Sequence, residues 1–115
     1  MIGKMVQNTA KKTKIAEKAT ICSGAWCKTV GLMFSKKRTI VFAFGKERRR
    51  GLHMFFVFFP IDLIFLDGNK KVVELKESFK PFTFYNSRKK AQYVIECPAG
   101  AIRKSKTAIG DRVKF

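Results

Sequence analysis

Short apolar runs are the feature of this chain that most limits its possible folds. The longest uninterrupted run, Met54 to Phe59, contains six residues, and basic residues or glycines separate one run from the next. Strands of about four to eight residues fit such runs, so the pattern indicates an all-β protein with short connections. A membrane-spanning helix needs roughly 20 apolar residues, and no run approaches that length, so no membrane partner is expected.

The expected strands follow these runs. They are 39–44, 52–59, 61–66, 71–76, 91–97 and a last strand ending at Phe115, with a charged turn at 45–51 and two further strands in the first 20 residues, joined at Thr9 to Lys12. Strand 52–59 is apolar on both faces, which favours the centre of a sheet. Pro60 cannot donate to a ladder, and Asp67-Gly68-Asn69 suits a hairpin turn. Short helices are expected at 23–30 and just after Pro98.

No feature of the sequence divides the chain. It has no internal repeat, low-complexity segment or linker, so residues 1–115 are expected to form a single β-rich domain. Twelve phenylalanines supply large apolar side chains for a dense core. Short connections favour antiparallel pairing of neighbouring strands. We therefore predict a mainly β fold, an antiparallel β-sandwich or distorted barrel of about seven to nine strands with one or two short helices.

Positive charge is the strongest signal in the composition, since 25 lysines and arginines face eight acids and the net charge is +17. Such an excess attracts polyanions, which include nucleic acid, an anionic membrane surface and an acidic protein. The basic residues gather at predicted connections, in clusters at 36–38, 48–50, 70–71, 88–90 and 103–106. Each cluster taken alone suits a solvated surface, and the sequence does not fix whether the clusters converge.

One function hypothesis follows from that charge. A sequence-tolerant nucleic-acid binder would place basic side chains on phosphates, and its affinity would fall linearly with the logarithm of the salt concentration. The residues expected to make these contacts are Arg48, Arg49, Arg50, Arg88, Lys89 and Lys90.

Cysteine usage bears on both compartment and metal binding. Three cysteines without a secretion signal predict a reducing interior and a cytoplasmic location. Cys22, Cys27, Cys97 and His53 could in principle form a tetrahedral zinc site. However, Cys22 and Cys27 lack the tight Cys-x-x-Cys spacing and the other two stand alone. The cysteines are therefore interpreted as small buried hydrophobic residues, and no metal and no cofactor is expected.

The sequence contains no residue pattern that is typical of a known catalytic site. The chain has one histidine, its acids are scattered singly among bases, and its glycines form neither a phosphate loop nor a dinucleotide fingerprint. No catalytic residue is assigned, and an enzyme is kept only as a third hypothesis that no motif supports.

Four stretches in order resemble a known family. They are Gly31-Leu32-Met33-Phe34, Met54 leading to Pro60 through Asp67, Glu96-Cys97-Pro98-Ala99-Gly100, and Gly110-Asp111-Arg112-Val113. Their order and spacing, from about Ala16 to the C-terminus, resemble the prokaryotic domain-of-unknown-function family 192, especially its archaeal members. The resemblance implies a compact β fold of jelly-roll-like type and no established activity. The chain departs from the family where arginines are usual, at Lys28 and Ser35, and has His53-Met54 where Trp-Met is frequent.

A second function hypothesis, which the sequence favours slightly over the first, is a non-enzymatic module that binds a small ligand or a protein. The motifs concentrate around His53, Met54, Pro60 and Asp62, which are the candidate ligand-binding residues. Asp62 stands in an apolar strand, where a carboxylate is costly unless it is paired or accepts backbone donors. Its structural interpretation is a clamp at the Pro60 bend, held by backbone N–H groups or an arginine. Its functional interpretation is a place in a pocket with His53 and Met54.

Overall fold

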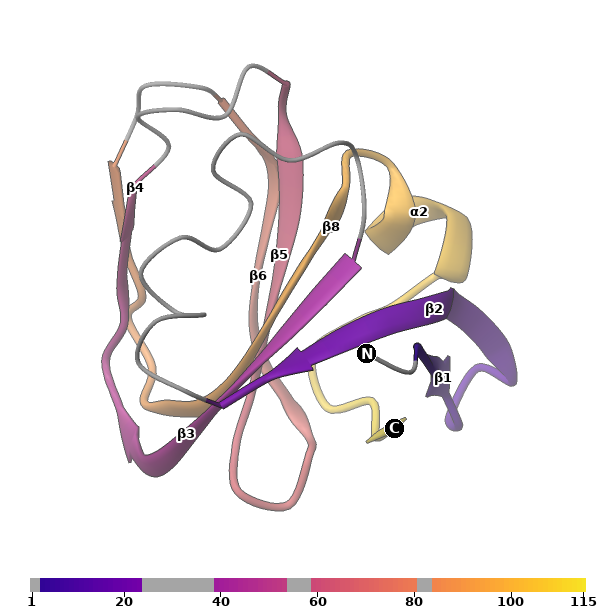
Figure 1. Ribbon diagram of the computed structural model, residues 1–115, viewed down its shortest axis with the longest axis horizontal. Helices are drawn as coiled ribbons and strands as arrows, with labels where there is room; N and C mark the ends of the chain where they lie inside the picture. Colours follow the sequence, from indigo (N-terminus) through magenta and orange to yellow (C-terminus); the bar gives the residue numbers. More distant parts are fainter. Residues whose placement is uncertain (1–2, 24–38, 54–58, 81–83) are drawn as a thin grey trace.

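The computed structural model describes residues 3–23, 39–53, 59–80 and 84–115, with side chains for all of these except 51–53 and 84. Nine strands and one short helix occupy the described residues (Figure 1). They are β1 (Lys4–Asn8), β2 (Thr13–Cys22), β3 (Thr39–Arg48), β4 (Gly51–His53), β5 (Ile61–Leu66), β6 (Val72–Phe79), β7 (Phe84–Asn86), β8 (Ala91–Pro98), α2 (Ala101–Ser105) and β9 (Val113–Lys114).

Seven of these strands form one curled sheet in the order β6-β5-β8-β3-β2-β1-β9, and β4 and β7 form a separate pair. Neighbouring strands are antiparallel except β2 and β3, which are parallel. The two ends of the strand order meet, because the Val72 N–H donates to the Asp111 carbonyl at 2.8 Å and the Val113 N–H donates to the Lys70 carbonyl at 2.9 Å. The curled sheet is thereby a distorted barrel, which confirms the predicted fold class.

Each face of the curled sheet carries its own core. The barrel core lies on the side of α2 and includes Val6, Val41, Ile64, Ile95 and Ile102. The outer core lies on the opposite face, under the β4–β7 pair, and includes Ile40, Phe42, Leu63, Phe65 and Val94. Strand β5 contributes to both, and all six of its residues are buried. That burial explains why its sequence is apolar on both faces.

Most strand predictions are confirmed, including the two strands in the first 20 residues and the break at Pro60. The hairpin turn after β5 is also confirmed, since the Asp67 carboxylate accepts from the Asn69 N–H at 2.9 Å and the Lys71 N–H at 3.0 Å. The predicted charged turn at 45–51 is wrong for its first part, because β3 continues through Gly45 to Arg48. Side chains in that extension are exposed, so burial gave no signal for it.

Some predictions fall on residues outside the described ranges. These are the helix at 23–30, apart from Ser23, the motif Gly31 to Phe34, and residues 54–58 of the strand predicted at 52–59. Of its described residues, 52 and 53 lie in β4, which among the described strands pairs with β7 alone and is not at the centre of a sheet as expected, and Phe59 lies outside the strands. Strand β7 itself was not predicted.

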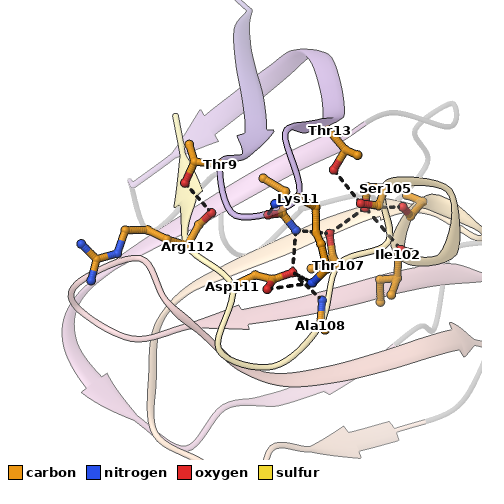
Figure 2. Close-up of polar contacts among 11 residues, drawn as sticks. Thr9, Lys11, Thr13, Ile102, Ser105, Thr107, Ala108, Asp111 and Arg112 are labelled. Carbon is orange, nitrogen blue, oxygen red and sulfur yellow. Dashed lines mark hydrogen bonds and ion pairs between the residues drawn. The ribbon is translucent and has the colours of Figure 1, made fainter.

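The turn between β1 and β2 is fastened to the chain before β9 (Figure 2). The buried Asn8 amide donates to Thr107 Oγ1 at 3.1 Å and to Asp111 Oδ2 at 2.9 Å. Lys11 Nζ donates to Asp111 Oδ2 at 2.8 Å, and the Ala108 N–H donates to the same oxygen at 2.9 Å. These bonds, led by those from Asn8 and Lys11, lower the pKa of Asp111 to about 2. The fourth sequence motif therefore has a structural role at Asp111.

Replacing Asp111 by Asn removes the charged partner of Lys11 and should lower the free energy of unfolding by about 1 to 2 kcal/mol at pH 7. The loss is no larger because Lys11 is partly solvated, which screens its pairing with Asp111. Since the folded-state pKa of Asp111 is depressed, this contribution is present above about pH 4 and is lost as the pH falls toward 2. Urea unfolding at pH 7 and pH 2.5 measures both effects. E17Q, in an exposed ion pair with Lys14, is the control and should leave the stability nearly unchanged. A D111N deficit that persists undiminished at pH 2.5 would contradict the assignment.

Candidate functional site

Asp62 is fully buried on the α2 side of β5. Its Oδ1 accepts from the Ser78 N–H at 2.9 Å, and its Oδ2 accepts from the Gly100 and Ile102 N–H groups at 3.0 Å each. The carboxylate thus joins β5 to the end of β6 and to the start of α2. Three backbone donors compensate the desolvation of the charge. The geometry is the one that the structural interpretation requires, with backbone N–H groups as partners.

The structure does not bring the four candidate ligand-binding residues into one described site. Pro60 is exposed, whereas the Asp62 carboxylate points to the α2 side and is already bonded. The side chain of His53 and the whole of Met54 lie outside the described residues. A shared ligand site for these residues stays a prediction.

Replacing Asp62 by Asn should destabilise the protein by about 3 kcal/mol or more, because an amide nitrogen would face N–H donors in a buried place. The measurement is the midpoint and slope of urea unfolding at pH 7. E77Q, on the exposed part of β6, is the matched control and should leave the midpoint unchanged. A D62N variant as stable as wild type would exclude the clamp and favour a functional role for Asp62.

Cysteine chemistry differs between the two described cysteines. Cys97 is free and buried, and burial, with the nearby charges of Asp62 and Glu96, raises the pKa of its thiol. A protonated thiol is a poor nucleophile, so Cys97 fits the predicted role of a small hydrophobic residue. Cys22 is buried, as predicted, but it is disulfide-bonded, which is contrary to the reducing interior that the cysteine content predicted. Among the described residues, no three His, Cys, Asp or Glu side chains are grouped as metal ligands.

Glu96 lies next to Cys97 on β8 but on the face that carries the outer core. Its strand neighbours are Ile40 on β3 and Leu63 on β5, both buried and apolar. Burial among such residues raises the pKa of Glu96 to about 7. A carboxylate there is neutral in weak acid and charged above neutrality, and its charged form weakens the fold.

The E96Q variant should therefore gain stability over wild type as the pH rises. A folded-state pKa raised to about 7 means that wild type loses stability between about pH 4.5 and pH 7, whereas the amide does not titrate. We expect E96Q to be more stable by about 1 to 3 kcal/mol at pH 8 and nearly equal at pH 5, by urea unfolding. Parallel pH profiles for the two proteins would exclude a raised pKa at Glu96. E77Q serves again as the control.

Two basic clusters that are distant in sequence lie side by side at one end of the molecule. Strand pairing sets Arg48 opposite Ala91. The Arg50 N–H donates to Ser87 Oγ at 2.7 Å, the Ser87 N–H donates to the Arg50 carbonyl at 2.8 Å, and Arg50 Nε donates to the Ala91 carbonyl at 3.1 Å. The exposed basic residues around this contact are named the basic edge, and they are Lys46, Arg48, Arg49, Arg88, Lys89 and Lys90.

A buried acid holds one half of the basic edge in place. Glu74 Oε1 accepts from the Arg88 N–H at 2.7 Å and from the Lys89 N–H at 2.8 Å. Its Oε2 accepts from the Tyr85 hydroxyl, and burial together with that bond raises the pKa of Tyr85 to about 12. Ser87 Oγ donates to the Lys89 carbonyl at 2.9 Å. The backbone of the turn is thus fixed, while its basic side chains remain exposed.

Ion pairing does not neutralise this charge within the described part of the chain. The ion pairs there are Lys11–Asp111 and Lys14–Glu17, and neither includes a residue of the basic edge. Arg50 has a different role from its neighbours, since its guanidinium lies 3.8 Å from the centre of the Phe44 ring. Burial and the charge of Arg48 lower the pKa of Arg50. Arg50 therefore fastens the edge, and the exposed residues carry its charge outward.

Comparison with known proteins places the chain in a family. The model of the family DUF192, described as an uncharacterized ACR, matches residues 6–115. The chain belongs to this family. A UPF0127 protein of Pyrococcus horikoshii is 34% identical over 96% of this chain and 98% of its own length. Another, from Pyrococcus furiosus, is 38% identical over 75% of this chain and 76% of its own length. The resemblance seen in the sequence motifs is confirmed and extends ten residues further toward the N-terminus.

Solved structures agree on the fold. A crystal structure of a Sinorhizobium meliloti protein has a TM-score of 0.84 and 20% identity, covering 96% of this chain and 89% of that chain. A protein of unknown function from Novosphingobium aromaticivorans has a TM-score of 0.83 and 18% identity, covering 96% and 82%. No helix in the described part of the chain is long and apolar enough to cross a membrane. The cytoplasmic location stays a prediction.

Sequence reasoning missed Glu74 and Ser87, which organise the basic edge. Glu74 stands between the apolar residues Val73 and Leu75 in β6, so an acid inside an apolar strand was the available signal. Ser87 carried no such signal, because its importance comes from two backbone bonds that only the fold creates.

Proposed function

We propose that this protein is a non-enzymatic binding module for a polyanion, with nucleic acid as the ligand class and the basic edge as the site. The observation that supports the proposal is the junction of Arg50 with Ser87 and Ala91, which brings the clusters at 48–50 and 88–90 together. Arg48, Arg49, Arg88, Lys89 and Lys90 bind phosphates, and Arg50 positions them. Such contacts are tolerant of sequence, because phosphates carry no base information.

The hypothesis of a small-ligand site at His53, Met54, Pro60 and Asp62 has weaker support. Both carboxylate oxygens of Asp62 already accept backbone N–H groups, so a ligand would have to compete with these bonds. From that hypothesis we keep the non-enzymatic binding module, but the proposed ligand is a polyanion and the proposed site is the basic edge.

The proposal predicts how steeply the affinity for nucleic acid falls with salt concentration. Five phosphate contacts would give a slope of about −4.5 in log affinity against log salt on duplex DNA. Affinity should then fall roughly 10²- to 10³-fold between 50 and 200 mM salt. Nuclease-treated protein titrated into labelled single- and double-stranded nucleic acid over this range measures the slope and any preference for one form.

Matched variants locate the site. R88Q/K89Q/K90Q should reduce the slope by about 2 to 3 and weaken binding at least tenfold at 100 mM salt. K4Q/R103Q/K114Q removes the same charge from exposed positions on β1, α2 and β9 and should have a smaller effect. Equal losses in the two triple variants would overturn the basic edge as the site. Binding that vanishes in wild type by physiological salt would overturn the proposed function.

A further inference from the structure

A cleft of about 550 Å³ lies at the other end of β8 from the basic edge. One wall is the first half of β2 with Lys14 and Lys18, and the other is the turn from Pro98 to Ala101 with Lys104 behind it. Ala91 of β8 is at the basic edge and Pro98 is at the cleft, which separates the two by about 23 Å along the strand. The cleft is therefore a separate place on the molecule.

The register of the sheet explains why there is a hollow at this position. Strand β2 pairs with β3 from Ala19 to Cys22, starting opposite Thr39. Before Ala19, β2 pairs with β1 on one edge, and no described strand pairs with its other edge. That second edge faces the Pro98–Ala101 turn across the cleft.

Asp62 keeps the opposite wall in place. Its carboxylate accepts hydrogen bonds from the N–H groups of Gly100 and Ile102, so the turn is anchored to β5. Gly100 has a φ of 98°, and a Cβ built on it would meet nothing within 4 Å, so the wall is open toward solvent at this residue. The turn carries the third sequence motif, and Ala99 and Gly100 are exposed on it. A preformed wall lowers the cost of ordering a site around a ligand.

The charge of the cleft is positive. Among the described residues, three lysines line it against one acid, Glu17, which is bonded to Lys14 at 2.9 Å. Lys18 and Lys104 take part in no ion pair within the described residues. The volume falls within the range of about 300 to 1,000 Å³ that is usual for small-molecule pockets. It suits a small anion better than a polymer, which would need a longer charged track.

We propose that this cleft binds a small organic anion, a molecule with two or more carboxylate or phosphate groups, through Lys18 and Lys104. The two ammonium groups neutralise the ligand charge from opposite walls. This site is independent of the basic edge, so either proposal can fail without the other.

Amide NMR titration of the full chain tests the proposal. Citrate and pyrophosphate are added separately at constant ionic strength, with chloride as the reference anion, so that the two arms separate carboxylate from phosphate recognition. We expect saturable shifts at Ala99, Gly100 and Lys104 with at least one of the probes. Shifts confined to 48–50 and 88–90, or shifts that never saturate, would overturn the cleft as a specific site.

Two kinds of variant separate charge from shape. K18Q/K104Q should weaken binding at least tenfold, whereas the control K4Q/K114Q, which removes the same charge elsewhere, should bind as wild type does. A99F leaves every lysine in place but puts a large side chain on an exposed residue of the wall, and it should also abolish saturation. Wild-type affinity in both K18Q/K104Q and A99F would exclude the cleft.

Discussion

A single buried carboxylate, Asp62, joins the parts on which the rest of this structure depends. Its two oxygens accept backbone donors from the end of β6 and from both residues that flank the start of α2. Because β5 is buried throughout and pairs with both β6 and β8, the clamp sits on an interior strand of the sheet. An ion in such a place is stable only when its donors stay fixed, so Asp62 makes the arrangement of three elements mutually dependent.

The same use of acids recurs through the protein and explains its surface. Asp62, Asp67, Glu74 and Asp111 all accept backbone N–H groups. With only eight acids in the chain, those four are tied to internal tasks. Few carboxylates remain to pair with 25 lysines and arginines. The positive surface is thus partly a consequence of how the fold is held, and Glu74 directs some of that charge into one edge by fixing the turn at Arg88 and Lys89.

The sequence predicted those parts of the fold whose signals are local. Short apolar runs marked β5 and β8, and the Asp67 turn followed from its turn-forming residues. The extension of β3 to Arg48 had no such mark, because its side chains are exposed. For the site, residue type identified the arginines and Asp62. Whether these residues lie close together depends on the order of the strands in the sheet. That order pairs β3 with β8, which are about 40 residues or more apart in the sequence, and no local pattern encodes it.

Barrel closure has a consequence for how the chain folds. Strand β1 finds its second neighbour, β9, only in the last residues, and the bond from Asn8 to Asp111 spans 103 positions. During synthesis the β1–β2 hairpin must wait with one edge open until β9 has emerged. Closure is therefore expected as a late event, after the local hairpin of β5 and β6 has formed. The exposed lysines along β1 and β2 then help to keep that waiting edge from pairing with another chain.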